Sequence, residues 1–461
     1  MGSLLGSMAI ATGALEAEQG ALDATSNNVA NVNTPDYSRQ QVILSENAPI
    51  VIGNVSFGTG VSLQQLQSVR DPILQTRIAE ETQAQGQLNA YVSQMQQTQV
   101  QFSSTGGNDI GTQISKFFAS LQQLSTNPSD SSLRQAVLTA AQNVANAFNS
   151  TARNLNQQES SLNSNVTQDV QQINTLTAQI AGLNQQISSL QDVGQGAGAL
   201  IDQRDAAINQ LSGLIDVSEI QSDGTGLTLT TSNGSPLVTG GQSFALSTQA
   251  DASGTQQVYS GTNDITDQIV SGDLGGVIQA RDQTIPGLLS SLDTLAGGLA
   301  DGLNAANQQG FDLNGNAGGN LFVPPPANDQ GAAVNMAVAI TDPSLIAASS
   351  DGTPGSNGNV ANLSAVANQS ISGGGTPSQY YGNIVFQVGN DVSNSTAELT
   401  AAQSILQQLQ DQRGSISGVS LNEEAANMVQ FQQAFDAAAQ IVTTVNAMLY
   451  TVINMGTLTN P

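Results

Sequence analysis

SISGVSLNEEAANMVQFQQAFDAAAQIVTTVNAMLYTVINM, from Ser415 to Met455, is the stretch that decides the fold of this chain. At alternating intervals of four and three residues it is apolar at eight of ten positions, over more than four heptads. Such a narrow apolar stripe indicates a helix that lies along a partner helix. Ser420 is a candidate N-cap, and Glu423 and Glu424 suit the positive end of the helix dipole. The ten positions are Leu421, Ala425, Met428, Gln432, Phe435, Ala439, Val442, Asn446, Leu449 and Ile453.

A second amphipathic helix is predicted between residues 2 and 32. Glu18 and Thr25 interrupt its stripe, and Thr34–Pro35 predicts its end, because the residue before a proline is driven out of the helical conformation. A stripe of this kind also suits a core helix of a globular domain, but a helix near a chain end usually needs a partner elsewhere. We therefore expect the two ends of the chain to pack together. The apolar residues of this stripe, again at intervals of three or four, form a ladder of Leu4, Met8, Ala11, Leu15, Leu22, Val29 and Val32.

The composition excludes several classes of function. The formal charge is −26 with a single lysine, Lys116, so nucleic acid and anionic membranes would be repelled and neither is expected as a partner. Cysteine, histidine and tryptophan are absent, which excludes disulfides, thiolate or imidazole metal sites and Ser–His–Asp catalysis. Carboxylate chemistry, as in glycosidases, is compatible with the composition. The low aromatic content (4%) and the lack of a paired-carboxylate motif argue against it, so no enzyme and no cofactor is predicted.

The middle of the chain is predicted to be a long-helix rod with a small β-rich insert. Residues 131–190 are periodic throughout, and a helix of that length would span about 90 Å; its Asn, Gln and Ser residues are predicted to be solvated. Residues 217–269 are rich in Gly, Ser and Thr, with turn signals at Asp223–Gly224 and Asn233–Gly234. Within residues 199–214, Asp202, Arg204 and Asp205 are expected to form surface or interhelical ion pairs.

These elements predict a mainly α protein, a long-helix bundle or coiled-coil rod formed by both termini, with a small β-rich inserted domain. The terminal helical domain would comprise 1–34 and 415–461. The rod domain would comprise 35–216 and 270–414, and the insert 217–269.

A short motif at Asp312, Asn314 and Asn316 has the alternate oxygen-bearing positions of a calcium loop. No glutamate closes it, because Val323 stands at the twelfth position. A hydrogen-bonded turn is the favoured interpretation, and ion binding stays open. The N-terminal region lacks a secretory signal, since Glu16 and Glu18 stand where an apolar segment is required, and no run is long enough for a membrane helix.

Several segments resemble flagellar axial proteins. SNNVANVNTPDYSRQ (26–40) is similar to the N-terminal signature of flagellar rod, hook and hook-associated proteins, and SGVSLNEEAANMVQFQQAFDAAAQIV (417–442) to their C-terminal signature. Segments 199–217, 272–315 and 340–363 resemble the hook-associated protein 1 family, the proteins of the hook–filament junction.

The resemblance implies a non-enzymatic structural subunit that assembles into a ring between hook and filament. It implies export by the flagellar type III route, an extracellular location in the flagellum, and a cytoplasmic chaperone on the C-terminal helix. Implied partners are hook subunits and the second junction protein or filament. The alternative is another axial protein: the second junction protein, a flagellin, or a hook or rod subunit. The predicted assembly interface is Leu4, Met8, Leu15, Leu22, Val29, Leu421, Met428, Phe435, Val442, Leu449 and Ile453.

Overall fold

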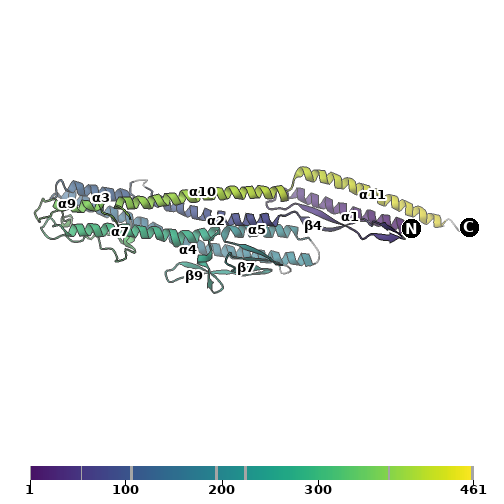
Figure 1. Cartoon of the computed structure of the whole chain (residues 1–461), viewed down its shortest axis with the longest axis horizontal. Coiled ribbons are helices and arrows are strands. Elements are labelled where there is room, and N and C mark those ends of the chain that lie inside the picture. Colours follow the sequence, from purple (N-terminus) through teal and green to yellow (C-terminus); the bar gives the residue numbers. More distant parts are fainter. Residues whose placement is uncertain are drawn as a thin grey trace.

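The chain is an elongated helical rod with both termini at one end (Figure 1). The computed structural model describes residues 2–52, 54–103, 107–192, 196–222, 226–371 and 374–457. The expected fold class, mainly α with a small β region, is confirmed. Among the described residues, none of the helices combines the length and apolar character needed to cross a membrane.

The helices are α1 (Gly2–Ala30), α2 (Pro72–Gln101), α3 (Ile110–Leu124), α4 (Ser131–Asp192), α5 (Gly198–Leu214), α6 (Gly272–Gln279), α7 (Ile285–Gln308), α8 (Ala332–Asn335), α9 (Gly358–Ala365), α10 (Pro377–Ser417) and α11 (Leu421–Thr457). The strands are β1 (Gln40–Glu46), β2 (Ile50–Ile52), β3 (Val55–Phe57), β4 (Val61–Ser68), β5 (Ser218–Ser222), β6 (Gly226–Thr230), β7 (Pro236–Thr239), β8 (Gln242–Ser243), β9 (Leu246–Ala250), β10 (Gln256–Ser260) and β11 (Asn263–Asp264). A π-helical turn, η2 (Ala280–Thr284), joins α6 to α7.

The rod is built on α4, whose 62 residues form the predicted long helix. Asp130 begins this helix by accepting hydrogen bonds from the backbone N–H groups of Ser132 and Leu133. One stripe of α4, which includes Val144, Leu162 and Ile180, is completely buried. These side chains belong to one continuous core that α2, α3, α5, α7 and α9 share. Apolar burial along the whole length of α4 therefore gives the rod its stability.

Close helix crossings in the rod depend on glycine. A Cβ atom at Gly276 of α6 would overlap the backbone oxygen of Gln87 in α2, and one at Gly86 of α2 would overlap the oxygen of Gly213 in α5. The backbones of α2, α5 and α6 thus touch without side chains between them. The cost of glycine in a helix interior is offset at these positions by packing that no larger residue permits.

The predicted β-rich insert consists of two antiparallel sheets beside α4, with strand orders β5–β6–β7–β8 and β11–β10–β9 (Figure 1). The turn at Asn233–Gly234 joins β6 to β7, with a positive φ of 88° at Gly234. The other predicted turn, Asp223–Gly224, lies outside the described residues.

Asparagines of α4 hold the insert. Asn174 Nδ2 donates to Leu246 O and Asn174 Oδ1 accepts from Leu246 N, both at 2.8 Å. Asn184 Nδ2 donates to Gly240 O at 2.8 Å. The prediction that the polar residues of this helix are solvated was wrong at these positions, because unpaired strand groups require partners.

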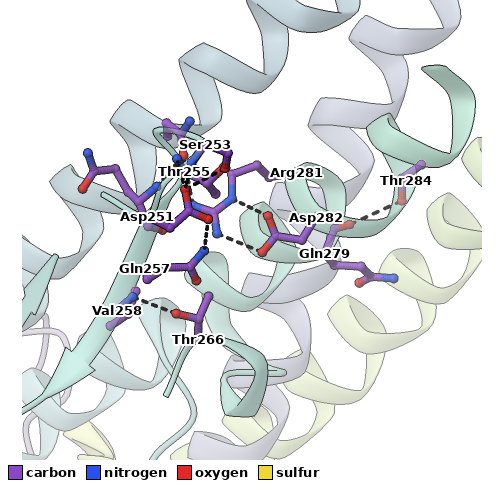
Figure 2. Close-up of polar contacts among 12 residues, drawn as sticks. Asp251, Ser253, Thr255, Gln257, Val258, Thr266, Gln279, Arg281, Asp282 and Thr284 are labelled. Atoms are coloured by element: carbon purple, nitrogen blue, oxygen red, sulfur yellow. Dashed lines mark hydrogen bonds and ion pairs between the residues drawn. The ribbon is translucent and has the colours of Figure 1, made fainter. Parts of the chain in front are cut away.

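Arg281 fixes the insert against the rod from the other side. Its side chain is fully buried at the π-helical turn. Figure 2 shows its guanidinium against the carboxylate of Asp282, with distances of 2.6 and 2.8 Å. Arg281 Nη1 also donates to Gln256 O of β10 at 2.6 Å and to Asn163 Oδ1 of α4 at 3.1 Å. One side chain thereby joins three elements of the rod and insert.

The Asp312 motif forms a hydrogen-bonded turn. Asp312 Oδ1 accepts from the N–H groups of Asn314 and Asn316, each at 2.8 Å, and Asp312 Oδ2 accepts from the Asn316 side chain at 3.4 Å. Both oxygens of the carboxylate are therefore engaged by the turn itself.

Asp169 makes the rod sensitive to pH. Burial and the nearby carboxylate of Asp273 raise its pKa to about 7, and Asp169 Oδ2 is buried with no hydrogen-bond partner among the described residues. Because the folded-state pKa lies above the ordinary value of 3.8, the charged form is penalised on folding. Stability should therefore fall as pH rises from about 4 to about 7.

We expect Asp169→Asn to be more stable than the natural chain at pH 8, by a few degrees in thermal unfolding followed by circular dichroism. The difference should vanish below about pH 3, where the carboxyl is protonated in both the folded and the unfolded state. Asp192→Asn, an exposed carboxylate on the same helix, is the matched control. A gain that is independent of pH would contradict this account.

Candidate functional site: the terminal helix pair and its junction with the rod

The two terminal helices lie side by side and antiparallel, beyond the end of the rod (Figure 1). Asn28 near the end of α1 meets Glu424 at the start of α11. Among the described side chains of the pair, the buried apolar ones are small, apart from one valine: Ala11, Ala17, Ala21, Ala24, Ala438 and Val445. None of them belongs to the apolar core of the rod. The pair is thus held by close contact of small residues, with little apolar volume between the helices.

The predicted interface residues fall into two groups. Leu421 and Ile453 are exposed, at 52% and 59%. The other nine are half-buried: Leu4, Met8, Leu15, Leu22, Val29, Met428, Phe435, Val442 and Leu449. In the free chain these side chains are neither fully packed nor fully solvated.

The contact stripe of α11 differs from the predicted one at several alternate positions, although the predicted Ala439 is half-buried. Met428, Phe435, Val442 and Leu449, seven residues apart, are half-buried as the ladder requires. Between them the inward residues are Phe431, Ala438 and Val445, and the predicted Gln432 and Asn446 are exposed. From Met428 onward the inward residues follow at intervals of three and then four, instead of four and then three. Apolar Phe431 and Val445 therefore take the places predicted for polar Gln432 and Asn446.

Strands β1 and β4 cover a second side of α1. They form an antiparallel ribbon in which Gln40 pairs with Ser68 and Glu46 with Val61. A Cβ atom at Gly13 of α1 would lie 2.7 Å from the backbone oxygen of Val61. The predicted rod domain began at residue 35 and so included these residues, and their contact with α1 was not predicted. The glycines of α1, which let another segment approach the helix backbone closely, were the feature of the sequence that could have indicated this contact.

Asn28 is the central polar residue of the junction and is 1% exposed. Its Oδ1 accepts from Gln40 N at 2.8 Å and from the Tyr37 hydroxyl at 2.9 Å. Its Nδ2 donates to Gln40 O at 2.8 Å and to Glu424 Oε2 at 3.2 Å. One side chain therefore ties α1, the following loop, β1 and α11 together.

Burial and the carboxylates of Asp202 and Glu424 raise the pKa of Tyr37 to about 12. Its hydroxyl therefore keeps the proton that it donates to Asn28.

Arginines join the terminal helices to the rod. Arg413 of α10 pairs with Asp36 and also donates to Asp36 O at 2.8 Å. Arg39 pairs with Glu423 of α11 at 3.2 Å, and its backbone N–H donates to Ser417 O at 2.8 Å.

A third arginine contact lies beside these. Arg70 pairs with Asp202 of α5 at 2.7 Å, and Asp202 also accepts from Ser38 N at 3.2 Å. Asp202 therefore takes part in an ion pair between elements, as expected. Arg204 pairs with its neighbour Asp205 at 3.3 Å.

Among the described residues, no group of three or more acidic side chains is arranged so that it could hold a metal ion.

The terminal unit, made of α1, β1–β4 and α11, carries most of the large apolar side chains that are exposed among the described residues. Of 24 large apolar side chains that are exposed among the described residues, 16 lie in α1, β1–β4 and α11. Those of α11 are Leu421, Val429, Ile441, Met448, Tyr450, Val452 and Ile453. Apolar surface gathered on one part of a chain marks a site of interaction.

Comparison with known proteins identifies the family. Residues 93–322 match the flagellar hook-associated protein FlgK helical domain, 412–455 the flagellar basal body rod FlgEFG protein C-terminal domain, and 8–37 the flagella basal body rod protein domain. Flagellar hook-associated protein 1 of Escherichia coli (strain K12) is 29% identical over 96% of this chain and 98% of that protein. The chain belongs to the flagellar hook-associated protein 1 family.

Two further proteins are similar to this chain, one in sequence and one in solved structure. Flagellar hook-associated protein 1 of Bacillus subtilis (strain 168) is 29% identical over 96% of each chain. The solved flagellar hook junction protein FlgK from Burkholderia pseudomallei matches with a TM-score of 0.65 and 20% identity, over 74% of this chain and all of that one. At that identity the match shows the fold alone.

Replacing Asn28 with alanine should loosen the terminal unit, because it leaves buried donors and acceptors of Gln40 and Glu424 unpaired. The loss is on the order of 3 kcal/mol, which corresponds to about a hundredfold faster hydrogen exchange in α11. Asn27→Ala, at an exposed neighbouring position, is the control. Equal exchange in both variants would show that Asn28 does not hold the junction.

Proposed function

We propose that this chain is a structural subunit of the bacterial flagellum that joins hook to filament, assembling through α1, α11 and the β1–β4 segment. The observation that carries the proposal is the contrast within the terminal unit. Its buried apolar residues are small, while 16 of its large apolar side chains are exposed and others are only half-buried. A lone chain has no means to cover them, so neighbouring subunits would supply the remaining contacts.

The proposal includes a revised division of the chain. The polymerising unit comprises residues 2–69 and 415–457, because β1 and β4 pack on α1. The rod comprises residues 70–216 and 270–414, and the insert residues 217–269. The rod and insert would stand outside the ring of terminal helices.

The proposed partners follow from the family. These are hook subunits, the second junction protein or filament, and further copies of this chain in a ring. The relatives are named hook-associated, and the two terminal domains match rod-protein domains. The FlgK helical domain in the middle favours the junction over the alternative of a hook, rod or filament subunit. The role is packing rather than catalysis, and the site is extracellular, reached by type III export.

Cells lacking this protein should build hooks without filaments and release flagellin into the medium. Complementation with Ile441→Asp/Met448→Asp should fail to restore filaments, because charges on the exposed face of α11 would block the contacts between subunits. Phe386→Asp, which charges an apolar side chain that is 69% exposed on the rod, should restore them. Electron microscopy and swimming assays provide the measurements. Normal filaments in the deletion strain would refute the junction role.

We also propose that a cytoplasmic chaperone covers α11 before export. An apolar helix face that is exposed before assembly promotes aggregation until another protein buries it. Val442→Asp/Leu449→Asp should reduce chaperone recovery in pull-down at least about tenfold, since a charge in an apolar groove is strongly disfavoured. Phe386→Asp again serves as control. Unchanged recovery of the double variant would place the chaperone site elsewhere.

A further inference from the structure

A pocket of about 270 Å³ lies between α1, β1 and the first turns of α11. Ala17, Ala21 and Ala24 contribute small apolar surfaces to it, and Phe431 supplies an aromatic one. Its polar lining includes Glu18 and Arg39. The junction described above does not use the side chain of Glu18 and uses that of Arg39 only through Nη1.

Two polar atoms of this pocket, one on each of two oppositely charged side chains, lack hydrogen-bond partners. Glu18 Oε2 and Arg39 Nε are each shielded from solvent, and among the described residues neither makes a hydrogen bond. The two side chains do not form an ion pair with each other, whereas Arg39 Nη1 contacts Glu423 at 3.2 Å. A buried donor or acceptor atom without a hydrogen bond is costly, so a group that pairs with both atoms would be bound with a clear gain.

The chemistry of the pocket defines its occupant. The occupant must donate to a carboxylate and accept from a guanidinium, so a neutral side chain with both functions fits. An ionised carboxylate has no proton to donate to Glu18, and a lysine or arginine side chain has no acceptor for the N–H of Arg39. A carboxamide has one donor and one acceptor side by side, and the glutamine chain is long enough to cross the alanine surface.

We propose that this pocket receives a glutamine carboxamide from α11 of a second copy of the chain. Gln433 and Gln440 are exposed and lie seven residues apart, on the side of α11 opposite Ala438 and Phe431. Two copies that each carry a charge of −26 gain most from neutral contacts, because opposite charges are scarce on both surfaces. The inference rests on the proposed self-assembly and specifies one contact within it.

The test measures self-association of the purified full-length chain by sedimentation velocity over a concentration series. Glu18→Ala should weaken association about ten- to a hundredfold, the range for a hydrogen bond to a charged group. Glu16→Ala, an exposed carboxylate two residues away on the same helix, should change it less than about twofold. The direction of the change in association distinguishes a filled pocket from an empty one. If the pocket stayed empty in the assembly, removal of the Glu18 carboxylate would leave association unchanged or strengthen it.

Double-mutant cycles then identify the occupant. Gln433→Ala or Gln440→Ala should weaken association to a similar extent and show no further loss when combined with Glu18→Ala. Coupling of Glu18 to Gln41, an exposed glutamine of β1, would place a side chain of the same copy in the pocket and overturn the proposal. Additive losses with both glutamines of α11 would overturn it as well.

The outcomes separate this contact from the proposed function. If the natural chain associates and Glu18→Ala associates equally well, the pocket contact is refuted and assembly stands. If the natural chain remains a monomer at all concentrations while hooks in the deletion strain lack filaments, self-association is refuted and the junction role stands. Circular dichroism of the monomer confirms that each variant is folded.

Discussion

Alanine at the contact between α1 and α11 is the constraint on which the terminal unit depends. A buried alanine removes little apolar area from water compared with leucine, at roughly 0.8 kcal/mol for each buried methylene. Two helices that meet through alanines approach closely but gain little from the approach. Their position is set instead by polar contacts at one end, where Asn28 joins Gln40 and Glu424. The rod has the opposite design, with Phe117, Phe148 and Leu155 fully buried in a continuous core.

The rod and the terminal unit thus have different roles in a structural subunit. The rod keeps its form without partners, since its core is complete in one chain and Arg281 holds the insert to it. The terminal unit leaves large apolar side chains such as Ile441 and Tyr450 exposed. Stability of the fold and stability of the proposed assembly would thus depend on different residues. Substitutions in one set need not disturb the other.

The elements that follow from local chemistry could be predicted from the sequence. The start of α2 follows from Asp71 and Pro72, and the length of α4 follows from its unbroken apolar period. What the sequence did not reveal depends on tertiary partners. Asn174 resembles a solvated residue until Leu246 lies beside it. The inward position of Phe431 rather than Gln432, by contrast, could have been predicted, because a ladder that begins with a step of three is apolar at every position from Met428 to Leu449.

The arginines of the junction have a consequence for proteolysis. Arg39 is the first basic residue of the sequence and Arg413 the last, so trypsin has no site within α1 or α11. Both arginines are ion-paired and largely buried, Arg39 with Glu423 and Arg413 with Asp36. The same contacts that join the terminal helices to the rod therefore shield the two bonds whose cleavage would release each terminal segment whole. The rate of that cleavage reports directly on how often the junction opens.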